Sequence, residues 1–162
     1  MTMDESERKY CKVSLKVDDA AVRREVLLAE PTAVDSVFVV KSIPAFLFGV
    51  APGDMIRVTN SDSGEFQIVA RGGNVAIRLF LKGTLDREDV SELIERVTSV
   101  GGTYEVGFNK DNPERTSLLL LSVGIDKGFG FIEQIMKGSS ATGWEWEYAN
   151  VYDKLGKPLN WW

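Results

Sequence analysis

The residue types that carry most enzyme chemistry are scarce in this chain of 162 residues, which contains no histidine and a single cysteine, Cys11. Histidine is the commonest general base and metal ligand, so its absence removes Ser-His-Asp triads and makes a zinc centre implausible. Cys11 has no imidazole to activate its thiol, and we interpret it as a buried or half-buried strand residue. The remaining side chains for acid–base or metal chemistry are carboxylates.

Two groups of carboxylates have a spacing that chemistry could use. Glu145 and Glu147 alternate with aromatic residues, which places both on one face of a strand about 7 Å apart. This separation suits a retaining glycosidase pair or a divalent-ion site, and a metal-dependent hydrolase is one hypothesis. Asp86, Glu88 and Asp89 stand at a predicted helix start, where acidic side chains interact favourably with the helix dipole. We expect that Glu145 and Glu147 lie on an exposed strand face and that the other three carboxylates belong to a helix start.

A glycine-rich segment, residues 124–130, links a predicted strand to a predicted helix. It lacks the Gly-Lys-Ser/Thr ending of a P-loop and the Gly-x-Gly-x-x-Gly spacing of a dinucleotide site. We interpret it as a helix entry with Asp126 as the N-cap. The sequence therefore predicts no catalytic residue, no cofactor and no metal, and we expect that the protein is not an enzyme.

The charge of the chain bears on its partners and its compartment. The formal net charge is −5 and basic residues do not cluster, which argues against nucleic acid and anionic membranes and suits a basic partner. The acidic N-terminus does not resemble a signal peptide, and no apolar run reaches the ~20 residues of a membrane helix. Because a lone cysteine fits a reducing compartment, we expect a cytoplasmic protein.

The first half of the chain has the pattern of short strands. Residues 1–9 form a polar leader that we expect to be disordered. Alternating or β-branched residues predict strands at 10–17, 22–30, 35–43, 55–59 and 65–70. The segment Ser42–Val58 begins with a turn-rich apolar crossing, with Pro44, Gly49 and the turn Ala51–Asp54, and we interpret it as a barrel corner. Residues 10–72 are therefore predicted to form a small antiparallel β-barrel or sheet.

The second half, residues 73–162, alternates strands with helices. Strands are predicted at 75–82, 104–108, 116–123 and 144–148, and helices are predicted after Asp86 and after Asp126. The four consecutive leucines of the third strand indicate a central position, buried on both faces. The order β-α-β-β-α-β is that of a ferredoxin-like arrangement, with both helices on one face of an antiparallel sheet. The whole chain is thus predicted to belong to the α+β class.

The chain ends in two tryptophans, Trp161 and Trp162. Gly156 and Pro158 precede them and argue against a final helix or a central strand. Burial of one large apolar side chain is worth roughly 1.5–3 kcal/mol, so exposure of both indoles would mark a partner site. We expect instead that the tail docks onto the body as a structural latch.

Three segments together resemble a known family. They are the strand end Leu28-Ala29-Glu30, the crossing with Ile43-Pro44, Gly49 and Gly53-Asp54, and the strand from Asn74 to Leu81. The chain resembles a bacterial family of domains of unknown function, family 4265, which shares an aromatic-Ala-Glu strand end, an Asn-x-Pro-Phe crossing to Gly-Asp and a Tyr-Arg-hydrophobic strand. The resemblance implies a shared fold and assigns no catalytic residue. Some families of this size and context supply immunity proteins for bacterial toxins.

Two functional hypotheses follow, besides the hydrolase. The first is a non-catalytic protein-binding module, an immunity protein that masks a basic toxin domain through aromatic anchors and complementary charge. The second is a regulatory module with a small-molecule cleft between the two halves, lined by Arg78 and the segment Gly49–Asp54. For the first hypothesis the candidate partner-binding residues are Glu105, Glu145, Glu147, Trp144, Trp146, Trp161 and Trp162.

Overall fold

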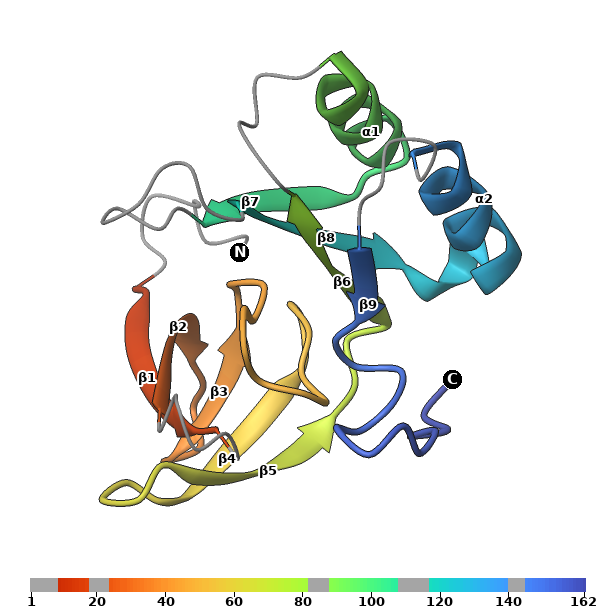
Figure 1. Cartoon of the computed structure of the whole chain (residues 1–162). Coiled ribbons are helices and arrows are strands. Elements are labelled where there is room, and N and C mark those ends of the chain that lie inside the picture. The colour runs from red at the N-terminus through yellow and green to blue at the C-terminus, as the bar shows by residue number, and fades with distance from the viewer. Residues whose placement is uncertain (1–8, 18–23, 82–87, 108–116, 140–144) are drawn as a thin grey trace.

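The computed structural model describes residues 9–17, 24–81, 88–107, 117–139 and 145–162. Within these residues the protein is α+β, with two antiparallel sheets of five and four strands and two α-helices (Figure 1). The predicted α+β class is confirmed. Residues 1–8 of the predicted leader, Asp86 and Trp144 lie outside the described residues.

The five-stranded sheet contains the five strands expected in the first half. Its spatial order follows the chain, and each strand pairs antiparallel with the next. Alternate side chains such as Leu15 and Leu27 point into a buried cluster, as a half-buried sheet requires. The strands are β1 (Cys11–Lys16), β2 (Arg24–Pro31), β3 (Val37–Val40), β4 (Met55–Asn60) and β5 (Glu65–Ala70).

β4 and β5 form an antiparallel hairpin. The side-chain Oδ1 of Asn60 accepts hydrogen bonds from the N–H groups of Asp62 and Ser63, which fixes the turn. The N–H of Lys16 at the end of β1 donates to the carbonyl of Gly64 at 2.9 Å. The first and last strands of this sheet therefore approach each other at one end.

The four-stranded sheet has the order β7-β8-β6-β9, and all of its neighbouring strands are antiparallel. Its strands are β6 (Asn74–Leu81), β7 (Thr103–Gly107), β8 (Ser117–Gly124) and β9 (Glu145–Tyr148). The two central strands are buried on both faces, so the interpretation of the leucine run in β8 is confirmed. β7 and β9 form the two edges of this sheet.

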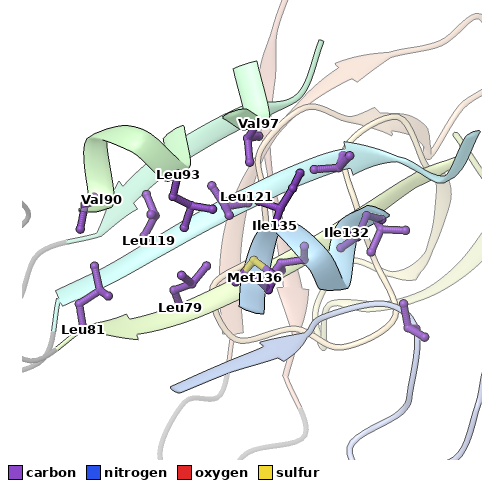
Figure 2. Close-up of a cluster of buried hydrophobic side chains, with 14 residues drawn as sticks. Leu79, Leu81, Val90, Leu93, Val97, Leu119, Leu121, Ile132, Ile135 and Met136 are labelled. Atoms are coloured by element: carbon purple, nitrogen blue, oxygen red, sulfur yellow. The ribbon is translucent and has the colours of Figure 1, made fainter. Parts of the chain in front are cut away.

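Both helices pack on the same face of the four-stranded sheet (Figure 2). α1 (Glu88–Ser99) buries Val90, Leu93 and Val97 there, and its first turn contains Glu88 and Asp89 as predicted. α2 (Phe129–Ser139) adds Ile132 and other apolar residues. The interpretation of Asp126 as the cap of α2 is wrong, because it lies within a separate 3-10 turn, η2 (Ile125–Lys127), and α2 begins only at Phe129.

The predicted strand 35–43 is shorter than expected, because the chain leaves the sheet after Val40. Residues 41–54, which we call the crossing, then pass between the two sheets. Ile43 and Ala51 of the crossing pack against Ala76 of β6 and other residues of the second half, and Gly49 N–H donates to the carbonyl of Ala149 at 2.8 Å. The crossing therefore joins the two halves. The division of the chain into subdomains 10–72 and 73–162 stays a prediction.

Candidate functional site

Arg78 of β6 lies beneath the crossing. Its side chain is 1% exposed, donates a hydrogen bond to the carbonyl of Leu47, and places its guanidinium carbon 4.6 Å from the ring centroid of Phe48. Its Nε lies 3.5 Å from Oε1 of Glu147 on the neighbouring strand β9. Burial lowers the pKa of Arg78, while the charges of Glu147 and Glu25 oppose this shift. Arg78, which was expected to line a cleft between the two halves, is buried because Leu47 and Phe48 of the crossing cover it.

Two carboxylates, one from each sheet, accept hydrogen bonds from the backbone of the crossing. Glu25 of β2 accepts hydrogen bonds from the N–H groups of three consecutive residues, at 2.6–2.9 Å, in positions 45–47. Glu105 of β7 accepts one from the N–H of Ile43. Burial raises the pKa of Glu105, the hydrogen bond from Ile43 lowers it, and the nearby charge of Glu25 raises it further. Glu105, a predicted partner-binding residue, is thus engaged within the molecule.

A third carboxylate, Asp54, is buried at the end of the crossing. Its oxygens accept hydrogen bonds from the N–H groups of Ala51 and Gly72, both at 2.9 Å, and one lies 3.3 Å from the guanidinium of Arg71. Burial raises its pKa, while these hydrogen bonds and the charge of Arg71 lower it. The turn predicted at Ala51–Asp54 is therefore held by the side chain of its own last residue.

β9 presents aromatic residues on one face and acidic residues on the other, as its sequence predicts. Trp146 stands opposite Leu79 of β6 and packs with the helix-covered core. Glu145 and Glu147 stand on the other face, where Glu145 is exposed and Glu147 reaches Arg78. The described residues contain no group of three or more Cys, Asp or Glu side chains that could hold a metal.

A cavity of about 460 Å³ opens beside β9. Perpendicular ring contacts organise one side of it, because the centroids of Trp146 and Tyr148 lie 5.1 Å apart with an interplanar angle of 84°. Burial and the charge of Glu133 raise the pKa of Tyr148 to about 12, so its phenol stays neutral at physiological pH. The cavity is lined by Phe48, Trp146, Glu147, Tyr148, Tyr152, Asp153, Lys154 and Gly156.

The two terminal tryptophans differ in their surroundings. Trp161 docks on the body, because its indole N–H donates to the carbonyl of Asn150 at 2.6 Å and its ring lies 5.6 Å from the guanidinium of Arg71. Trp162 is 48% exposed and makes an edge contact with Phe129 of α2, with centroids 5.2 Å apart. The expectation of a docked tail therefore holds for Trp161, whereas Trp162 leaves half of its surface open.

We expect that Trp161→Ala lowers the free energy of unfolding by about 1–3 kcal/mol, because it removes a half-buried indole and its hydrogen bond. Trp162→Ala is the matched control and should cost clearly less. Urea denaturation of both variants measures the difference. Equal losses, or no loss for Trp161→Ala, would show that the tail is no latch.

The structure brings some predicted residues together and separates others. Trp146 and Glu147 share the cavity, and Trp162 contacts Phe129, which in turn packs edge-on against Tyr148. Glu105 lies on β7, at the opposite edge of the sheet from β9. Trp144 lies outside the described residues.

Sequence reasoning missed six of the cavity residues, which are Phe48, Tyr148, Tyr152, Asp153, Lys154 and Gly156. The sequence contained one signal for those that follow β9. Asp153 is followed by Gly156, and its carboxylate accepts hydrogen bonds from the N–H groups of Leu155 and Lys157 at 2.9 Å. An Asp followed three residues later by Gly is a turn pattern, and it could have indicated that the chain folds back after β9.

The fold and the site define an α+β protein of two antiparallel sheets with an aromatic and acidic cavity at one sheet edge. The chain belongs to the family described as domain of unknown function DUF4265, whose sequence profile matches residues 25–147. The resemblance noted from the sequence is thereby confirmed, and the crossing and its carboxylate partners lie within the matched residues.

A solved structure with the same fold is titled "Novel crystal structure of a hypothetical protein from Neisseria gonorrhoeae". It is 15% identical in sequence, has a TM-score of 0.57, and the match covers 88% of this chain and 94% of that chain. No curated protein matches the chain. Within the described residues, no helix has both the length and the apolar character needed to cross a membrane.

Proposed function

We propose that the protein is a non-catalytic binding module that acts by binding another protein, and specifically an immunity protein that masks a basic bacterial toxin. The observation that carries this proposal is the cavity beside β9, which aromatic rings and carboxylates line together. We define the β9 surface as the exposed Glu145 of β9 together with six residues that line the cavity: Phe48, Trp146, Glu147, Tyr148, Tyr152 and Asp153. Such a protein would act in the cytoplasm, where Cys11 stays reduced.

The composition of the β9 surface supports a protein partner. Tryptophan and tyrosine are the residues on which binding energy at protein interfaces concentrates, because they bury large area and keep a polar group. Tyr152 is 41% exposed, so an aromatic face is available at the rim. The carboxylates of Glu145, Glu147 and Asp153, together with the net charge of −5, favour a basic partner.

We also propose a finer description of the fold that carries this surface. The hydrogen bond from Lys16 to Gly64 supports a partly closed barrel in the first half. The order β7-β8-β6-β9, with both helices on one face, supports a ferredoxin-like arrangement in the second half. In this arrangement β9 is an edge strand, which leaves its side chains and backbone accessible to a partner.

Co-expression with the product of the neighbouring gene tests the proposed function. We expect a complex with a defined stoichiometry, whose mass is measured by light scattering after size-exclusion chromatography. The toxin's activity should fall in proportion to complex formation. A chain that stays monomeric beside this partner and leaves its activity unchanged would contradict the proposal.

A small-molecule-binding regulatory module is a second candidate, and the volume of the cavity favours it. About 460 Å³ lies within the range of ~300–1,000 Å³ that is usual for ligand pockets. The cavity is lined by Phe48 of the crossing, and the buried Arg78 lies behind that ring. A thermal-shift screen against metabolites tests this candidate, since a ligand raises the melting temperature with its concentration relative to Kd.

A further inference from the structure

We infer that the outer edge of β9 is a docking site for an extended segment of a basic partner, which adds to the sheet as a strand and inserts an arginine side chain into the adjacent cavity. This inference rests on the proposed function and names the part of the partner that is recognised. Two independent observations carry it: an edge of β9 that pairs with no other strand of the described residues, and a cavity that lies along that edge.

The strand edge follows from the sheet order, in which β9 pairs with β6 on one side and with no other described strand on the other. The N–H of Ala149, directly after β9, donates to the carbonyl of Ala76 at 2.8 Å. Because backbone groups alternate in direction along a strand, those of Glu147 also point towards β6. The N–H and C=O groups of Trp146 and Tyr148 therefore point away from the sheet, where an added strand could pair with them.

The cavity lies along the same edge, because side chains from both faces of β9 line it. Trp146 and Tyr148 belong to the helix-covered face, and Glu147 belongs to the face of the crossing. When an extended peptide adds to a sheet edge, its backbone provides affinity and a side-chain pocket provides specificity. β9 has both features within one strand of four residues.

The chemistry of the cavity favours arginine. The protein already binds its own Arg78 in this way, with the guanidinium over Phe48 and beside the carboxylate of Glu147. Both of these residues also line the cavity. A guanidinium can stack on aromatic rings and pair with carboxylates at once, which an ammonium does less well. The lining contains the carboxylates of Glu147, which also pairs with Arg78 behind it, and of Asp153, together with one basic side chain, Lys154.

A basic partner fits this edge better than a second copy of the chain. Pairing of two β9 strands would place Glu145 and Glu147 of each copy on one two-stranded ribbon. Four carboxylates at cross-strand spacing would repel one another, and charged residues on edge strands are a common means of preventing self-association. The same charges attract an arginine-bearing segment.

Capped heptapeptides of alternating threonine and valine with a central arginine serve as the probe, in a titration of the full-length protein followed by amide NMR. We expect the resonances of Trp146, Tyr148 and Tyr152 to shift, and those of the opposite edge strand β7 to stay unchanged. Replacement of the central arginine by glutamate should weaken binding at least about tenfold. Methylation of the peptide's backbone nitrogens should abolish it, because the side chains are kept and the strand pairing is lost.

Three outcomes would overturn the inference: no shift at β9 with the arginine peptide, equal binding of the glutamate peptide, or equal binding of the N-methylated peptide. These outcomes are distinct from a failure of the proposed function. A partner complex whose affinity does not change with Tyr152→Ala would refute this docking site and leave the proposed function intact. Binding of the arginine peptide at β9 without formation of any partner complex would refute the proposed function and leave the docking site intact.

Discussion

Arg78→Ala should lower the free energy of unfolding by about 3–4 kcal/mol, the largest effect that we expect from a single substitution here. The change deletes a side chain that is 1% exposed and leaves the carbonyl of Leu47 without its donor. It also removes the cation from the ring of Phe48. Glu147 is 42% exposed and can be hydrated, so its loss of a partner adds little. Chemical denaturation followed by tryptophan fluorescence measures the change.

Two further variants make the test of Arg78 specific. Arg57→Ala is the matched control, because Arg57 is an exposed residue of β4, and we expect a change within about 0.5 kcal/mol. Arg78→Lys keeps the charge but lacks the planar guanidinium, so it should recover only part of the loss. If Arg78→Ala and Arg57→Ala proved equally stable, the crossing would not depend on the buried guanidinium.

Asp54→Asn should cost about 2–3 kcal/mol. The carboxylate accepts hydrogen bonds from the N–H groups of both Ala51 and Gly72, whereas the amide of asparagine has only one oxygen. One of the two donors would then face an NH₂ group inside the protein, and Arg71 would lose its counter-charge. The matched control is Asp62→Asn in the exposed β4–β5 turn, which should change the free energy of unfolding by less than about 0.5 kcal/mol.

The pH dependence of this effect has a defined sign. Burial raises the pKa of Asp54 in the folded protein above its ordinary value of 3.8, so folding favours the protonated carboxyl. The stability gained from this shift is fully present below the unfolded pKa and is lost as the pH rises through the folded pKa. The stability difference between the wild type and Asp54→Asn should therefore widen as the pH falls from neutral towards 3.8. A difference that narrows would show that hydrogen bonding outweighs burial at this site.

The local pattern of the sequence predicted most of the secondary structure. Period-two alternation identified β1 and β9, and the leucine run identified β8 as a central strand, because these signals depend on which face of a strand is buried. The four-residue β3 was predicted too long, because its β-branched run continues into the crossing, where the apolar side chains are buried between the sheets instead of within one. Hydrophobic periodicity cannot distinguish these two kinds of burial.

The candidate site was only partly predictable for a similar reason. Trp146 and Glu147 were identified because they belong to one strand with a clear alternation. Phe48 and Tyr152 lie about a hundred residues apart in the chain and meet only because the crossing and the segment after β9 fold against the same strand. Arg78 was expected to line a cleft, and its burial was not predicted because its partners Leu47 and Glu147 are distant from it in the sequence.

The most direct test of the central claim is the affinity of the chain for its partner, measured by calorimetry for the wild type, Tyr152→Ala and Tyr104→Ala. Tyr152 lines the cavity and is 41% exposed, while Tyr104 is 45% exposed on β7 at the opposite edge of the sheet. We predict that Tyr152→Ala weakens binding at least about tenfold and that Tyr104→Ala leaves the Kd unchanged. An unchanged Kd for Tyr152→Ala, or an equal loss for Tyr104→Ala, would contradict the assignment of partner binding to the β9 surface.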